Sequence, residues 1–228
     1  AARQESIEIL REVVKDIGDA MSILLDMDGV LVDLVGGLVR RFKLGQGVRS
    51  YIRKRFGTKQ QCPYSLTELF DCSDDDLLEA LTVDFWANLK PTPWCKKLTE
   101  ENAPVTVRFS AHRLVAWDEH EPYFRNAVLG KEQWIVKHLH AAFREQVIFA
   151  RWKMPLASGN ILIDDTESWR LFFPRMILVP APWNTNYSIY WEGDQAVVDY
   201  ITSELERIVL LREMRSLVPN DAMVKAIT

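Results

Sequence analysis

Short apolar runs alternate with longer segments of helical spacing through most of this chain of 228 residues. Five apolar runs have the length of a strand: 23–25, 105–108, 147–150, 160–163 and 177–179. Between the second and third of these runs, residues 131–143 place apolar side chains at the spacing of a helix. Strands that alternate with crossover helices form a parallel sheet with right-handed connections. We therefore predict an α/β fold in which helices flank a parallel sheet.

Three segments lie outside this alternation. Residues 1–20 place apolar side chains at helical spacing, which predicts an amphipathic helix that either packs on the core or docks on a partner. A small helical insertion is predicted after the first strand, and within it Ser73 and Asp76 have the spacing of a helix N-terminal cap. A final helix is predicted from Asp194 through Arg215. We therefore predict four parts: an N-terminal extension (1–20), a core (21–33 with 89–200), an insertion (34–88) and a C-terminal tail (201–228).

Two carboxylates follow the first apolar run directly. Asp26 and Asp28 are spaced i, i+2, and Gly29 comes next. In a strand this spacing puts both side chains on one face, and open α/β sheets bind ligands at the carboxyl ends of their strands. Two anions so close repel each other unless a cation lies between them, and Mg²⁺ prefers hard oxygen ligands. This pattern favours a phosphate and magnesium site, although the acids could instead only cap the following helix.

The pattern Asp-x-Asp-Gly-x-x-x-Asp, from Asp26 to Asp33, resembles the first motif of the haloacid dehalogenase superfamily. Lys153, followed by an apolar strand that ends in Asp164-Asp165, resembles its third and fourth motifs. Within the superfamily, the 5′(3′)-deoxyribonucleotidase family is similar in four segments: 85–93, 131–139, 151–153 and 159–165. The resemblance covers about residues 21–200. It implies a Rossmann-like sheet, and it makes the insertion at 34–88 a small helical cap over the substrate.

The resemblance also implies catalytic roles. Asp26 would be the nucleophile that forms an aspartyl-phosphate, and Asp28 would be the general acid and base. Lys153 would neutralise charge on the nucleophile and on the phosphoryl oxygens. Mg²⁺ would be held by Asp26, Asp164 and the backbone carbonyl of Asp28, and Asp165 would hold a water molecule or orient Lys153.

Substrate contacts are implied as well. Phe85 and Trp86 would form a stacking wall for a nucleobase, although without the resemblance they would be taken for ordinary core packing. Arg151 would be a second cationic contact. Phe109 occupies the position where the family has a threonine that binds phosphate, and Ser110 would replace that hydroxyl if the loop shifts by one residue.

Composition narrows the possible functions. A formal net charge of −4 gives no overall basic field that would attract nucleic acid. No apolar stretch is long enough to span a membrane. The three cysteines form no Cys-x-x-Cys pair, which favours reduced thiols in an intracellular protein, either cytoplasmic or mitochondrial.

Two functions of different classes follow. The first is a Mg²⁺-dependent phosphatase that hydrolyses (deoxy)nucleoside monophosphates, with a phosphatase for another small phosphate ester as a variant. The second is a weakened or inactive member of the fold that serves as a structural or binding subunit, which Phe109 at the second motif favours. A homodimer or a larger assembly is compatible with either.

Overall fold

A computed structural model describes most of the chain between residues 23 and 217: 23–45, 47–99, 109–114, 121–144, 147–150, 153–157 and 160–217. The predicted helix in residues 1–20 lies outside these ranges. No helix among the described residues has the length and apolar composition needed to cross a membrane.

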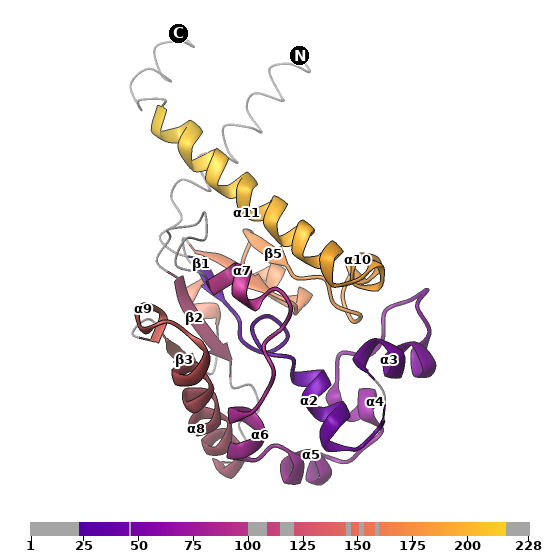
Figure 1. The fold of residues 1–228 in the computed structure, drawn as a ribbon. Coiled ribbons are helices and arrows are strands. Elements are labelled where there is room, and N and C mark those ends of the chain that lie inside the picture. The colour runs from indigo at the N-terminus through magenta and orange to yellow at the C-terminus, as the bar shows by residue number, and fades with distance from the viewer. Residues whose placement is uncertain are drawn as a thin grey trace.

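The core is a five-stranded sheet in which every neighbouring pair is parallel (Figure 1). Its order is β3-β2-β1-β4-β5. The strands are β1 (Ile23–Leu25), β2 (Phe109–Leu114), β3 (Ile148–Ala150), β4 (Ile161–Asp164) and β5 (Met176–Leu178). Side chains of β1, β4 and β5 are almost entirely buried, as expected for a sheet covered on both faces. The predicted α/β fold with a parallel sheet is therefore confirmed.

The second strand differs from its predicted position. The predicted strand at 105–108 lies outside the described residues, and the structure has its second strand, β2, at Phe109–Leu114, directly after that range. β1 pairs with the first half of β2 and β3 with its second half. Backbone hydrogen bonds with β1 and β3 hold β2 in the sheet along its whole length. Local apolar runs do not predict this extent, because it depends on the two neighbouring strands.

Five short helices occupy the segment predicted to be the insertion, and they lie beyond the carboxyl ends of the strands (Figure 1). They are α2 (Leu34–Arg41), α3 (Val48–Phe56), α4 (Leu66–Phe70), α5 (Asp74–Ala80) and α6 (Val83–Ala87). The chain leaves the core and returns to it at adjacent points, because Asp33 N donates to Lys90 O at 2.9 Å and Val32 bridges Pro91. The predicted cap of α5 is confirmed: Asp76 N donates to Ser73 Oγ, and Ser73 N donates to Asp76 Oδ2.

The remaining helices pack around the sheet. They are α7 (Cys95–Thr99), α8 (Glu121–His138), α9 (Ala141–Arg144), α10 (Tyr187–Glu192) and α11 (Asp194–Leu217), with 3₁₀ turns η1 (Met154–Leu156) and η2 (Glu167–Leu171). Gly130 of α8 lies against α6, where an added Cβ would come within 2.4 Å of Trp86 Cβ. The glycine thus permits close approach of α6 and α8.

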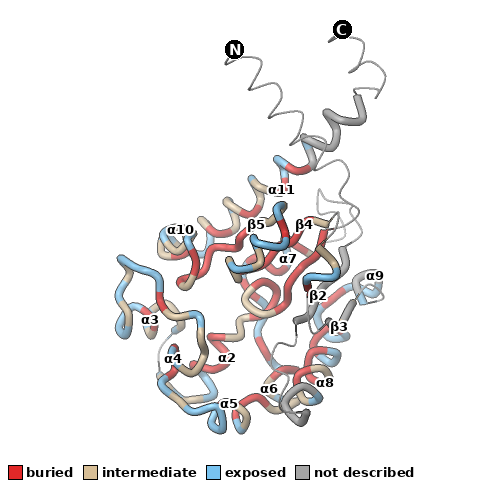
Figure 2. Tube along the Cα trace, turned by 180° about the vertical axis from the view of Figure 1, so that it is seen from behind, coloured by how far each residue is buried: buried red, intermediate tan, exposed pale blue. Residues whose placement is uncertain are grey.

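Helix α11 confirms the last predicted helix. Its buried residues Val197, Ile201, Leu205 and Ile208 share one face, and the red segments of Figure 2 mark such buried positions along the chain. The predicted tail boundary at residue 201 therefore falls inside one continuous helix whose first half belongs to the core.

Candidate active site

The loop after β1 carries the first acids to the edge of the sheet. Asp26 N donates to Ile163 O at 2.9 Å, which extends the pairing of β1 with β4 by one residue. The chain then turns tightly, because Leu31 N and Val32 N both donate to Met27 O. Gly29 has a φ of 78°, and an added Cβ there would lie 1.9 Å from Asp165 Oδ2. Glycine is needed at this position both for its backbone angle and for the space that Asp165 takes.

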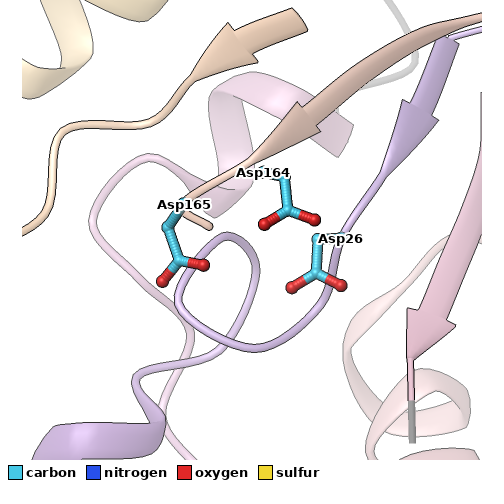
Figure 3. Close-up of side chains that lie close together, drawn as sticks. All are labelled: Asp26, Asp164 and Asp165. Atoms are coloured by element: carbon cyan, nitrogen blue, oxygen red, sulfur yellow. The ribbon is translucent and has the colours of Figure 1, made fainter. Parts of the chain in front are cut away.

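Three buried carboxylates meet at this edge (Figure 3). Each of Asp26, Asp164 and Asp165 offers an oxygen, and these oxygens all lie within 4.8 Å of one another. Asp26 follows β1, whereas Asp164 ends β4 and Asp165 comes next. Adjacent parallel strands end side by side, which brings together residues far apart in the sequence.

Burial disturbs the ionisation of this cluster. Desolvation raises the pKa of Asp26 to about 6, with Lys153 opposing the rise and Asp164 adding to it. Burial also raises the pKa of Asp165 well above its usual range, and the charges of Asp164 and Asp26 raise it further. A cation placed among these oxygens would reverse both effects.

Lys153 lies beside the cluster and is 2% exposed. Its Nζ donates to Asp26 Oδ1 at 2.6 Å and also to Asp164 Oδ2. Burial alone would lower the pKa of this ammonium, but the charges of Asp164 and Asp26 outweigh burial and raise it. Lys153 therefore stays charged, and it lies 5.5 Å from the centre of the Trp169 ring.

A second buried ammonium group forms an ion pair with Asp28. No role was assigned to this lysine from the sequence. Lys131 of α8 is 1% exposed, forms an ion pair with Asp28 and lies 4.5 Å from the centre of the Trp86 ring. The signal was present in the sequence, since Lys131 shares the buried face of α8 with Ala127 and Trp134. A lysine on the apolar stripe of a helix needs a charged partner.

Lys131→Met is expected to destabilise the protein by roughly 3 kcal/mol, because it leaves Asp28 without its ammonium partner in a largely buried place. Water reaches part of the Asp28 side chain, which is 25% exposed, so the loss is smaller than for a fully buried ion pair. Urea denaturation would measure this change. Lys137→Met is a matched control at an exposed position of the same helix, with an expected change within about 0.5 kcal/mol. Equal effects of the two substitutions would contradict a role for the ion pair.

A cavity of about 240 Å³ opens above the acids and the two lysines. Trp86 lines it, but Phe85 is not among its lining residues and instead lies beside Gly37 of α2. Adjacent residues of a helix point about 100° apart, so α6 turns only one of the two rings into the cavity. The predicted stacking wall of Phe85 with Trp86 is therefore supported for Trp86 alone. Aromatic rings from other segments complete the wall: Tyr64, Trp169 and Trp183.

The other predicted substrate contacts gain no support. Arg151 lies outside the described residues. Ser110 is paired with Leu24, two residues before the level of Asp26, so its backbone lies within the sheet and not at the carboxyl edge. Its role as a replacement phosphate ligand stays a prediction.

The residues of the site fit a divalent cation. Within the described residues, four carboxyl groups meet two ammonium groups, which leaves an excess of negative charge when all are ionised. The converging donors are hard carboxylate oxygens, the ligands that Mg²⁺ prefers. Asp26, Asp164 and Asp165 are therefore the side chains that could hold such an ion.

The sequence of the chain matches a known protein family. Residues 20–197 match the family of the 5′ nucleotidase, deoxy (pyrimidine), cytosolic type C protein (NT5C). The chain belongs to this family. The matched range contains all the residues of the candidate site, and it ends just inside α11.

Curated relatives of this NT5C-family chain are 5′(3′)-deoxyribonucleotidases. The mitochondrial enzyme of Mus musculus is 25% identical over 174 residues, which cover 72% of this chain and 73% of the relative. The mitochondrial enzyme of Homo sapiens is 28% identical over 65% of this chain and 63% of the relative. The cytosolic type of Homo sapiens is 27% identical over 66% of this chain and 73% of the relative. The resemblance found in the sequence motifs is thereby confirmed.

Proposed function

We propose that this chain is a Mg²⁺-dependent 5′-nucleotidase that hydrolyses (deoxy)nucleoside monophosphates through an aspartyl-phosphate. Membership in a family of nucleotidases supports the activity. The observation that carries the proposal is the buried Asp26 carboxylate, which contacts the Lys153 ammonium at the floor of an aromatic-lined cavity. A carboxylate in this setting can attack phosphorus while a fixed positive charge stabilises the phosphoryl oxygens.

In the first step, an Asp26 carboxylate oxygen forms a bond to phosphorus and the bond from phosphorus to the ester oxygen breaks. Asp28, protonated at the start of this step, gives its proton to the departing oxygen, and the Lys131 ammonium in contact with it stabilises the resulting carboxylate. In the second step, water forms a bond to phosphorus and gives a proton to the Asp28 carboxylate, while the bond from phosphorus to Asp26 breaks. Inorganic phosphate leaves, Asp26 is again a carboxylate and Asp28 is again protonated. Lys153 stays charged throughout, because Asp164 remains beside it and the negative charge of Asp26 is replaced by that of the bound phosphoryl group.

Asp26, Asp164 and the backbone carbonyl of Asp28 would hold Mg²⁺, and Asp165, whose carboxylate lies in the same cluster, would hold a water molecule or orient Lys153. The ion, when bound, would offset negative charge on the phosphoryl group and on the clustered acids. The nucleobase would lie against Trp86, and base stacking on such rings contributes about 1–3 kcal/mol.

The test is phosphate release from dUMP, dTMP and a simple aryl phosphate, each measured in Mg²⁺ and in EDTA. We expect turnover in Mg²⁺, loss of turnover in EDTA and recovery when Mg²⁺ is restored, since the clustered carboxylates repel substrate without a cation. Thermal unfolding in both buffers would show that the protein remains folded.

Folded protein that releases no phosphate from any of the three esters would overturn the proposal. It would favour the other hypothesis, that of a structural or binding subunit in a larger assembly.

The names of the relatives place them in mitochondria or the cytosol, and we propose an intracellular location for this chain too. A homodimer or a larger assembly stays a prediction.

A further inference from the structure

Tyr64 belongs to the predicted cap, yet its hydroxyl reaches the loop that carries the acids of β4. Tyr64 lies between α3 and α4, and its Oη is 3.0 Å from Thr166 Oγ1. Thr166 directly follows Asp165 and contacts both acids of the pair. Thr166 N donates to Asp164 Oδ1 at 2.7 Å, and Thr166 Oγ1 donates to Asp165 Oδ1 at 3.2 Å.

The direction of these hydrogen bonds is determined by the number of protons. With a cation at the site Asp165 would be ionised and could only accept, so Thr166 would donate its one hydroxyl proton to Asp165 and accept from Tyr64. A phenol keeps its proton at neutral pH, so the Tyr64 hydroxyl is able to donate. Each hydroxyl in this chain of hydrogen bonds polarises the next.

The segment around Tyr64 is docked on the core at further points. Cys62 N donates to Pro182 O at 2.9 Å, and the Tyr64 ring meets Trp183 edge to face with centroids 6.3 Å apart. Tyr64 as a whole is 59% exposed and lies at the rim of the cavity. Its hydroxyl bond to Thr166 therefore depends on the position of the segment from Cys62 to Tyr64 relative to the core.

Asp165 has little room to adopt another position. It is 5% exposed, its Oδ2 fills the space that a Cβ on Gly29 would need, and its backbone carbonyl accepts from Asn184 Nδ2 at 2.8 Å. Within the described residues, the Thr166 hydroxyl is the side-chain donor to its carboxylate. Loss or rotation of the Thr166 hydroxyl would therefore change the hydrogen bonding of the Asp165 carboxylate within the acid cluster.

We propose that Tyr64 and Thr166 are positioning residues that couple the docking of the segment 62–64 to the orientation of the Asp165 carboxylate at the Mg²⁺ site. When the segment is docked, Tyr64 occupies the acceptor site of Thr166 and directs the Thr166 proton to Asp165. When it is undocked, the Thr166 hydroxyl is free to rotate and the Asp165 carboxylate loses its oriented donor. The inference rests on the proposed Mg²⁺ site.

The test measures Mg²⁺ binding by isothermal titration calorimetry on the full chain, with no substrate present. Thr166→Val removes the hydroxyl with little change of shape, and we expect binding to weaken by about 10-fold, as for other residues that support metal ligands. Tyr64→Phe keeps the ring and should weaken binding by a smaller factor. The double variant should match Thr166→Val alone, because both changes break one chain of hydrogen bonds. Thr166→Ser, which keeps the hydroxyl, should restore most of the affinity.

Tyr187→Phe is the matched control. Tyr187 Oη donates to Lys59 O at 3.3 Å, so this tyrosine also joins the core to the segment 34–88. In the part of the chain that the structure describes, it forms no hydrogen bond with the acids of the site. We expect no change in Mg²⁺ affinity. Unchanged affinity in Tyr64→Phe, or independent and additive losses in the double variant, would overturn the coupling while the wild type still binds Mg²⁺. A wild type that binds no Mg²⁺ would overturn the metal site of the proposed function, and the coupling with it.

Discussion

Asp26→Asn is expected to lower phosphate release by about 10⁴-fold or more, the loss typical when a nucleophile is removed. The amide keeps the size of the carboxylate but cannot attack phosphorus effectively, so no aspartyl-phosphate forms. The hydrogen bond from Lys153 to this side chain has an oxygen to accept it in either case. The fold should therefore survive, and turnover numbers in Mg²⁺ would report the chemistry alone.

Asp199→Asn is the matched control for this substitution. It makes the same change of charge at an exposed position of α11, where Asp199 accepts a hydrogen bond from Gln195. We expect turnover within about twofold of the wild type, because exposed sites far from the chemistry have small effects. Turnover of Asp26→Asn within tenfold of the wild type would rule out Asp26 as the nucleophile.

Lys153→Met is expected to affect both activity and stability. Loss of the charge that faces the phosphoryl oxygens should lower turnover by about 10²- to 10³-fold. The substitution also leaves Asp26 and Asp164 without their shared ammonium in a buried place, which should lower the free energy of unfolding by about 3–5 kcal/mol. Urea denaturation at pH 8 in EDTA would measure this change.

The loss of stability in Lys153→Met should be smaller at pH 5 than at pH 8. Burial already raises the pKa of Asp26 to about 6 with Lys153 in place, so without the lysine this acid takes up a proton at pH 5 and loses its uncompensated charge. Lys54→Met, at an exposed position of α3, serves as the comparison, with an expected change within about 0.5 kcal/mol at either pH. A loss below 1 kcal/mol at pH 8 would contradict the pairing.

Several features of the site could be predicted because they depend on short stretches of the chain. An apolar run followed by acids identified Asp26, and a second such run that resembles a motif of the same superfamily identified Asp164 and Asp165. Parallel strands end at one edge of a sheet, so the meeting of these acids followed from the fold class. Lys153, which precedes the second run, reaches the same place.

The residues that were misplaced or missed depend on neighbours distant in sequence. β2 extends to Leu114 because β1 and β3 bond to it from opposite sides. Trp86 rather than Phe85 lines the cavity because α8 packs on one particular face of α6. Lys131 and Tyr64 acquire roles only through Asp28 and Thr166, which lie 103 and 102 positions away.

The sequence by itself therefore determined the α/β class and four of the five strands, because local periodicity encodes them. The resemblance of its motifs to a known family implied the family and the acids at the edge of the sheet. Only the tertiary structure decided which ring faces the cavity, which ammonium serves each acid and which hydroxyl reaches Asp165. These features depend on the packing of helices and loops against one another, and packing directions are set by contacts between distant segments.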